Sequence, residues 1–258
     1  MMIQLSQVTF QYPNHEAVFE NFNWHIQTGE AWAVLGPSGC GKSTLLYLLA
    51  GLRFPNSGTV VVGGDALTKP RPRTGLILQD YGLLPWATVR ENVSLGLRLR
   101  QFYGPDGMHA PTDQKVKDIE AQVQHWLTRL GLESLGDKYP GQISGGQRQR
   151  TAIARTLVTG PDLLLMDEPF ASLDAPTREN LGRLVRRLRQ EVGLTTVIVT
   201  HAIEEAARLG EKILVLGPPP NRTAMVVDNQ GAATEGYSQT KVYLDLCTRL
   251  HQHLEVIQ

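Results

Sequence analysis

The sequence predicts an α/β fold with a mainly parallel sheet, an antiparallel β subdomain at the N-terminus and an inserted α-helical subdomain. Three observations support this prediction. Apolar residues alternate from Ile3 to Tyr12, strand-like and helix-like runs alternate later in the chain, and the stretch from about 80 to 160 has helical periodicity. We therefore expect one domain, 1–258, with the helical subdomain at about 80–160 and a short C-terminal extension at about 218–258.

The first third of the chain is rich in strand-like runs. The turn Thr28-Gly29-Glu30 separates the antiparallel layer from a buried strand and a helix that begins at Lys42. Two further strands follow, and the second of them ends at Gln79. The predicted strands are, in chain order, 3–12, 18–26, 31–35, 59–62 and 73–78.

Helical signals dominate the next segment. Thr88 and Glu91 form a capping box, in which each side chain caps the other's backbone, and a helix follows towards Phe102. Residues 103–111 contain Gly and Pro and are predicted to be a loop. Apolar residues then recur at helical spacing from Val116 to Leu130, and Gly131 is the expected C-terminal stop.

Strands return in the last hundred residues, at 163–166, 195–199, 212–216 and 224–227. Pro176 is placed to start a helix that ends at Gly193, and a terminal helix is predicted over 243–254. Since strands and helices alternate here, the sheet is expected to be mainly parallel and covered on both faces.

The segment GPSGCGKST lies between the strand at 31–35 and the helix from Lys42, which is the context of a P-loop. Its backbone N–H groups and the helix N-terminus bind phosphates, Lys42 pairs the β- and γ-phosphates, and Ser43 ligates Mg²⁺. The core is therefore predicted to be that of a P-loop nucleotide triphosphatase. The predicted phosphate-binding residues are Gly36, Pro37, Ser38, Gly39, Cys40, Gly41, Lys42, Ser43 and Thr44.

Two adjacent carboxylates end the apolar strand at 163–166 and form a Walker B arrangement. Asp167 is predicted to hold the Mg²⁺ shell, and Glu168 to polarise the attacking water. An acidic pair at a strand end is also common in solvated turns, but the upstream P-loop favours the functional interpretation.

The segment Ile143-Ser144-Gly145-Gly146-Gln147 combines a hydroxyl, glycine N–H groups and a new helix N-terminus, which together suit a second anion site. It resembles the LSGGQ signature of the ATP-binding-cassette (ABC) ATPases, with Ile143 in place of the usual leucine. The resemblance extends from Ile3 to about Leu216. It implies that Ser144, Gly145, Gly146 and Gln147 contact ATP.

Further positions match motifs of this family. The resemblance implies that Tyr12 stacks on adenine, that Gln79 is the Q-loop residue acting in catalysis and on Mg²⁺, that Asp174 belongs to the D-loop, and that His201 is the switch histidine. Glu168, His201, Lys42 and Gln79 are then the catalytic residues, with ATP and Mg²⁺ as cofactors. Ala202 departs from the aspartate that often follows the switch histidine.

The chain carries one P-loop and one signature segment. In the family, the signature of one cassette faces the P-loop of another, so the resemblance implies a head-to-tail dimer with two ATP molecules between the copies. Whether the second cassette is an identical copy or a paralogue is left open by the sequence.

Leu83-Leu84-Pro85-Trp86 and the following Thr88-Val89-Arg90-Glu91-Asn92-Val93 resemble importer ATPases of the nitrate, sulfonate, taurine and thiamine-precursor type. The resemblance implies a membrane permease and, indirectly, an extracytoplasmic solute-binding protein as partners. Leu83, Leu84 and Trp86 either form a groove for a permease helix or pack inside the helical subdomain. The expected location is the cytoplasmic face of the inner membrane.

Composition bears on the alternatives. Lys+Arg and Asp+Glu are both 25, so no net basic field attracts nucleic acid, and we expect no nucleic-acid partner. Only two cysteines are present, no apolar run suits a membrane span, and no leader-like segment is seen, which favours a reducing cytoplasm. Two rival functions remain open: a soluble ABC protein acting on nucleic acid or ribosomes, and a regulatory module that binds ATP without hydrolysing it.

Overall fold

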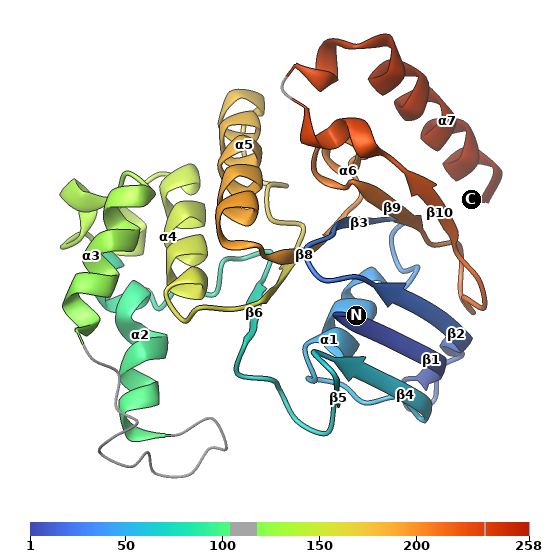
Figure 1. The fold of residues 1–258 in the computed structure, drawn as a ribbon, viewed down its shortest axis with the longest axis horizontal. Coiled ribbons are helices and arrows are strands. Elements are labelled where there is room, and N and C mark those ends of the chain that lie inside the picture. The colour runs from blue at the N-terminus through green and yellow to red at the C-terminus, as the bar shows by residue number, and fades with distance from the viewer. Residues whose placement is uncertain (104–117, 235, 258) are drawn as a thin grey trace.

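The computed structural model describes residues 1–103, 118–234 and 236–257, which form two sheets and their covering helices (Figure 1). The first sheet is antiparallel, in the order β2-β1-β4-β5. Its strands are β1 (Ile3–Gln11), β2 (Ala17–Ile26), β4 (Ser57–Val62) and β5 (Asp65–Ala66). The predicted strands thus form the expected antiparallel layer, and the short strand β5 was not predicted.

The second sheet has the order β10-β9-β3-β8-β7-β6 and is parallel except at its β9–β10 edge. All residues of β3 and β8 are buried, because helices and the first sheet cover both faces. The predicted α/β class with a mainly parallel sheet is confirmed. Its strands are β3 (Ala31–Leu35), β6 (Thr74–Ile77), β7 (Leu163–Asp167), β8 (Thr195–Thr200), β9 (Lys212–Val215) and β10 (Met225–Asp228).

Alternate residues of β3 enter different cores, since successive side chains of a strand point to opposite faces. Trp32 and Val34 join the core that also holds α1 (Lys42–Leu49) and the antiparallel sheet. Ala33 and Leu35 face a second core, which contains α6 (Ile203–Leu209) and the C-terminal segment. The phosphate-binding turn after β3 is thereby fixed from both faces.

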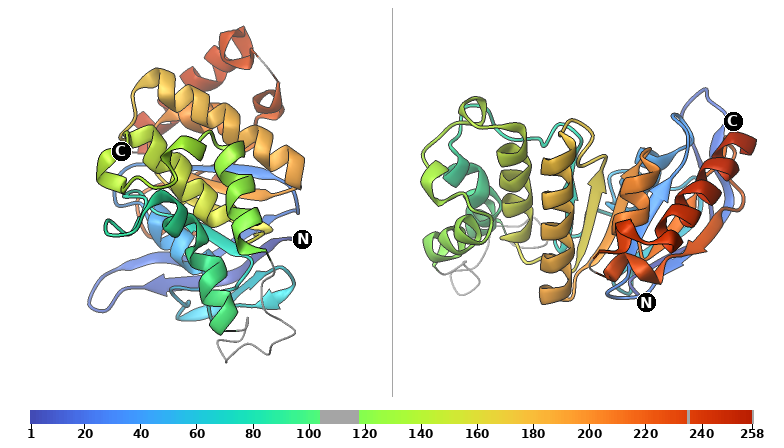
Figure 2. Two further views of the ribbon diagram at one scale, coloured as in Figure 1. Left: turned by 90° about the vertical axis from the view of Figure 1, so that its left-hand side faces the viewer. Right: turned by 90° about the horizontal axis from the view of Figure 1, so that it is seen from above.

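A helical lobe lies at one end of the molecule, away from the antiparallel sheet (Figures 1 and 2). Thr88 and Glu91 form the predicted capping box at the start of α2, and Ser144 and Gln147 form a second box at the start of α4. The lobe consists of α2 (Val89–Phe102), α3 (Ile119–Arg129), the single turns η2 (Glu133–Leu135) and η3 (Pro140–Gln142), and α4 (Gly145–Leu157).

The remaining helices connect the lobe to the C-terminus. The predicted helix α5 (Ala175–Val192) has proline in its first turn and ends at Gly193, whose φ of 66° explains the glycine. The short helix α6 was not predicted. After β10 come the turns η4 (Gln230–Ala233) and η5 (Tyr237–Gln239), and then the predicted terminal helix α7 (Lys241–Ile257), which packs against α6.

Two predicted segments, the loop at 103–111 and the helix from Val116, fall partly outside the described residues. The helix predicted from Val116 is seen from Ile119, and residues 104–111 of the predicted loop at 103–111 lie outside the described residues. Tyr103 is exposed and follows the end of α2. Within the described residues, none of the helices combines the length and apolarity needed to cross a bilayer.

Candidate functional site

The turn between β3 and α1 is tightly built and leaves no room for larger residues at two positions. A Cβ on Gly36 would lie 2.7 Å from both the Cys40 Sγ and the Leu216 carbonyl oxygen. Gly41 has a φ of 106°, and a Cβ there would lie 2.5 Å from Val18 Cγ1. Glycine is therefore required at both positions for the loop to curl against the strand and the helix.

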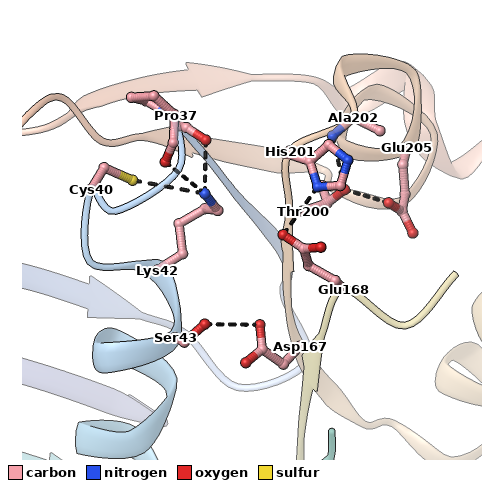
Figure 3. A network of polar contacts seen from close by, with 11 residues as sticks. Pro37, Cys40, Lys42, Ser43, Asp167, Glu168, Thr200, His201, Ala202 and Glu205 are labelled. Carbon is pink, nitrogen blue, oxygen red and sulfur yellow. Dashed lines mark hydrogen bonds and ion pairs between the residues drawn. The ribbon is translucent and has the colours of Figure 1, made fainter. Parts of the chain in front are cut away.

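Lys42 turns back over its own loop rather than towards solvent (Figure 3). Its Nζ donates hydrogen bonds of 2.8 Å to the carbonyl oxygens of Gly36 and Pro37, and the residue is buried. Cys40 is also buried, and burial raises the pKa of its thiol, which keeps the thiol neutral beside the ammonium group. The ammonium is thus held at the mouth of the phosphate-binding turn.

Ser43 and Asp167 approach each other from different elements. The Ser43 hydroxyl on α1 donates a 3.2 Å hydrogen bond to Oδ1 of Asp167 at the end of β7 (Figure 3). Burial, followed by the nearby charge of Glu168, raises the pKa of Asp167 against the opposing effects of Ser43 and Lys42. A hydroxyl and a carboxylate are hard oxygen donors of the kind that Mg²⁺ prefers.

Glu168 and His201 meet where β7 and β8 end, because parallel strands end at one edge of a sheet. His201 Nδ1 lies 3.0 Å from Glu168 Oε1 (Figure 3). Glu168 has a φ of 44°, in the left-handed region that non-glycine residues seldom adopt, and its backbone N–H donates to the Val199 carbonyl oxygen at 2.9 Å. The backbone therefore turns sharply to present this carboxylate.

Lys42, Ser43, Glu168 and His201 line an open cavity of about 1150 Å³, whereas Asp167 and Cys40 do not line it. Tyr12 forms one wall, its hydroxyl 3.2 Å from Thr44 Oγ1 and its ring edge-on to Phe10, with centroids 4.9 Å apart. Of the predicted residues, the structure gathers around this cavity Tyr12, Gly36, Pro37, Ser38, Gly39, Gly41, Lys42, Ser43, Thr44, Glu168 and His201.

Other predicted residues do not line the cavity. Gln79 is exposed just beyond β6, and Asp174 caps α5 by accepting a 3.2 Å hydrogen bond from the Thr177 N–H. Ser144 caps α4 by accepting a 3.3 Å hydrogen bond from the Gln147 N–H. Gly145 and Gly146 open the same helix, so the whole signature segment belongs to the helical lobe and not to the cavity of its own chain.

The C-terminal extension supplies contacts that the sequence did not predict. Asn221 is buried and donates a 2.8 Å hydrogen bond to the Cys40 carbonyl oxygen, and it accepts one from the Gly217 N–H at 3.1 Å. Pro219 and Leu254 line the cavity itself. No sequence pattern marks these residues, because they lie about 180 to 210 positions from the loop that they contact.

Comparison with known families agrees with this geometry. The sequence model described as ABC transporter matches residues 19–171, which is more than half of the chain. The chain belongs to the ABC transporter family. The match begins in β2 and ends just after the Walker B carboxylates, so it includes the P-loop and the signature segment.

Curated relatives in this family are similar over most of their length. The chain is 39% identical over 224 residues to the taurine import ATP-binding protein TauB of Pelagibacter ubique, which covers 86% of this chain and 80% of that protein. It is 38% identical over 213 residues to the aliphatic sulfonates import ATP-binding protein SsuB of Bacillus cereus, covering 83% and 79% of the two chains.

Solved structures of ABC cassettes share the fold. A dimeric post-hydrolysis ATP-binding cassette bound to ADP and Pi is 33% identical, with a TM-score of 0.70 over 83% of this chain and 94% of that one. CbiO1 from Clostridium perfringens, part of the transporter complex cbiONQ, is 28% identical, with a TM-score of 0.76 over 98% of both chains. The ABC protein described here is an ATP-binding ATPase with an ABC cassette fold.

Proposed function

We propose that this ABC ATPase couples ATP hydrolysis to solute uptake through a membrane permease. The observation that carries the proposal is the cavity in which Lys42, Glu168 and His201 converge beside Ser43 and Asp167. This arrangement supplies a phosphate-binding cation, a carboxylate that can polarise water and a histidine beside it, which are the groups that phosphoryl transfer to water needs. The intact carboxylate and histidine disfavour a module that only binds ATP.

Each predicted residue has a proposed role. Lys42 exchanges its two carbonyl contacts for the β- and γ-phosphates, and Tyr12 provides a ring for the adenine. Ser43 and Asp167, which already contact each other, would hold Mg²⁺, which neutralises developing phosphate charge when bound. Gln79 is exposed outside the cavity, and its role on the same ion rests on the family resemblance alone. Glu168 accepts the proton of the attacking water, while His201 holds the carboxylate and reaches the γ-phosphate.

The catalytic unit is a dimer in which Ser144 of each copy completes the site of the other. The nucleotide cavity is open, and the signature segment lies at the N-terminus of α4 in the separate helical lobe. A single chain therefore leaves the γ-phosphate side of the cavity uncovered. A head-to-tail pair with two-fold symmetry places a second anion-binding helix terminus, with Ser144, Gly145, Gly146 and Gln147, over each nucleotide. The dimeric relative bound to ADP and Pi supports this arrangement.

The dimer is tested with Glu168→Gln, which should bind ATP but hydrolyse it too slowly to release the partner. We expect the purified variant to elute as a dimer with Mg²⁺ and ATP and as a monomer with ADP, measured by size-exclusion chromatography with light scattering. Adding Ser144→Arg should abolish the dimer, because it places a bulky side chain at the shared site. Ser57→Arg, an exposed strand position, serves as the matched control. A Glu168→Gln protein that stays monomeric at every concentration would refute the sandwich.

The names of two relatives suggest the class of solute. One is a taurine importer subunit and the other an aliphatic sulfonates importer subunit, and we propose a solute of the nitrate, sulfonate, taurine or thiamine-precursor type, with the sulfonates favoured. The partners are a permease and an extracytoplasmic solute-binding protein, and the ATPase lies on the cytoplasmic face of the membrane. Uptake of radiolabelled taurine by cells expressing the chain with its permease tests this assignment. Uptake that is unchanged by Glu168→Gln would contradict it.

A further inference from the structure

A second cavity, of about 560 Å³, lies away from the nucleotide-binding turn, between α5, α6 and the turn η5 that precedes α7. In Figure 1 these elements lie beside one another, with the C-terminal segment passing next to α6. The walls share no residue with the nucleotide cavity. A cavity of this size suits a small molecule or a group of ions.

The second cavity is strongly basic. Five arginines line it, against the two acids Glu179 and Glu205. Four of the arginines lie on α5 and one lies on α6. Although the whole chain has no net charge, positive charge is thus concentrated where these two helices meet. The arginines are Arg178, Arg183, Arg186, Arg187 and Arg208.

Most of this charge is not neutralised by the described part of the chain. Only Arg187 of the five forms an ion pair there, with Glu191 at 3.7 Å. Arg178 and Arg186 each donate one hydrogen bond to a backbone carbonyl oxygen, that of Leu173 at 2.8 Å and that of Arg208 at 3.0 Å. These single contacts orient the guanidinium groups without balancing their charge.

Unused donors support the same conclusion. Within the described residues, the buried Nε atoms of Arg178, Arg186 and Arg208 have no hydrogen-bond partner. Burial and the neighbouring charges of Arg189 and Arg183 lower the pKa of Arg186, which is the response of a cation placed among cations. Because these Nε atoms are buried, an oxyanion would be recognised by the other N–H groups of the arginines that line the cavity.

The two acids, Glu179 and Glu205, do not cancel the positive charge of the cavity. Glu179 is exposed at the rim, and Glu205 is buried and uses one oxygen to accept a hydrogen bond from Thr200. Burial raises the pKa of Glu205 against the opposing effects of Thr200, Arg178 and His201, so two acids face five arginines in this cavity.

We infer that this arginine-lined cavity is a second anion site. It binds a small anion that carries a phosphate group or a sulfur-oxyanion group, and it does so independently of the nucleotide site. Guanidinium groups recognise such tetrahedral anions with paired N–H donors. An anion bound here bridges α5 and α6 to the segment at η5 and therefore stabilises the attachment of the C-terminal extension. The inference does not depend on the transported solute.

The test uses the full chain with saturating Mg²⁺ and a non-hydrolysable ATP analogue that retains a γ-phosphate group, so that the terminal-phosphate position of the nucleotide site is already filled. Sulfate and phosphate are titrated in separate arms at constant ionic strength set with sodium chloride, and binding is measured by isothermal calorimetry and by the shift in thermal unfolding midpoint. We expect saturable binding in at least one arm. Arg183→Gln/Arg186→Gln should weaken it at least about tenfold without changing the affinity for the ATP analogue.

Controls separate a specific site from general salt effects. Arg98→Gln/Arg222→Gln removes the same charge at positions outside the cavity and should bind as the unmodified chain does. Arg183 is exposed, so the single variant Arg183→Gln is expected to fold even if the double variant does not, and it should weaken binding about threefold or more. Binding that is equal in the cavity and control variants, or no saturation in either arm, would overturn the site.

Discussion

At the residue scale, the site depends on side chains placed at strand ends and held by few contacts. The 3.0 Å contact between His201 Nδ1 and Glu168 Oε1 joins two residues that follow neighbouring parallel strands. Because Glu168 occupies an unfavourable backbone conformation, its carboxylate depends on the surrounding structure for its direction.

We predict that His201→Ala lowers ATP turnover by about 100-fold or more while ATP affinity changes little, because the variant removes the partner of the general base, whereas Lys42 and the phosphate-binding turn retain most of the phosphate contacts. Phosphate release and fluorescent-nucleotide binding measure the two effects. His25→Ala, at an exposed position on β2, is the matched control and should retain full turnover. Equal losses of turnover and ATP affinity would contradict a role confined to catalysis.

Glu205 gives a prediction for pH dependence. Burial raises its pKa above the usual 4.5, so the folded protein retains a proton that the unfolded chain loses. The resulting stability is fully present below the ordinary pKa and is lost as pH rises through the folded pKa, by about 1.4 kcal/mol for each pKa unit. Glu205→Gln should abolish this loss.

Urea unfolding from pH 4 to pH 8 measures this effect as the free energy of unfolding. The Glu205→Gln protein should lose less of it than the unmodified chain over that range, whereas the exposed Glu204→Gln should behave as the unmodified chain does. Parallel pH profiles for Glu205→Gln and the unmodified chain would show that burial of this carboxyl has no net cost.

At the element scale, the nucleotide-binding turn is held by a segment from the far end of the chain. Asn221 is buried between the turn and β2, bonding to the Cys40 carbonyl and accepting from Gly217. The antiparallel sheet closes the other side, since Val18 lies against Gly41. The turn therefore owes its shape to two segments besides its own strand and helix, namely 217–221 and β2.

We predict that Asn221→Ala lowers the free energy of unfolding by about 1–3 kcal/mol, because it leaves buried backbone groups without partners. ATP affinity should fall about tenfold, since the Cys40 carbonyl lies in the phosphate-binding turn. Chemical denaturation and nucleotide titration measure the two effects. Asn180→Ala, on the exposed face of α5, is the control, and an Asn221→Ala protein that matches it would rule out a supporting role.

At the scale of the whole molecule, the helical lobe carries two surfaces that one chain does not use. The signature segment caps α4 away from the cavity, and Trp86 is 73% exposed in the same lobe. Leu83 instead packs against the apolar cluster of the lobe. The sequence left two roles open for this segment, packing inside the helical lobe and contact with a permease helix. Leu83 packs inside the lobe, whereas the exposed Trp86 is free to contact a partner.

We predict that Trp86→Glu leaves the free energy of unfolding within about 0.5 kcal/mol of the unmodified value, because the side chain is exposed. Binding to the permease should be lost, since an apolar anchor becomes charged. Co-purification of the co-expressed permease measures binding. Leu52→Glu, at a side chain that is 50% exposed after α1, is the matched control. Retained permease binding in Trp86→Glu would exclude this tryptophan from the interface.

Much of the site was predictable because its signals are local in sequence. The P-loop, the Walker B pair and the cap at Thr88 each occupy fewer than ten residues, and the structure forms the Thr88 cap as predicted. The cap that Ser144 forms at the start of α4 was not predicted. Helix α6 was missed since it has only 7 residues and its N-cap residue, Ala202, forms no side-chain cap. A helix this short is not stable by itself, because nucleating a helix costs more free energy than its few hydrogen bonds return. Helix α6 therefore depends on its packing against β3.

The sequence by itself determined the α/β class, the strand that ends in Asp167 and Glu168, and the turn that precedes Lys42. Those features follow from hydrophobic periodicity and from the local spacing of the P-loop residues in the sequence. Only the tertiary structure brought Asn221 to the phosphate-binding turn and Leu254 to the nucleotide cavity, and gathered arginines of α5 and α6 around a second cavity. Contacts between distant segments are chosen by packing of the complete fold, and no local pattern records them.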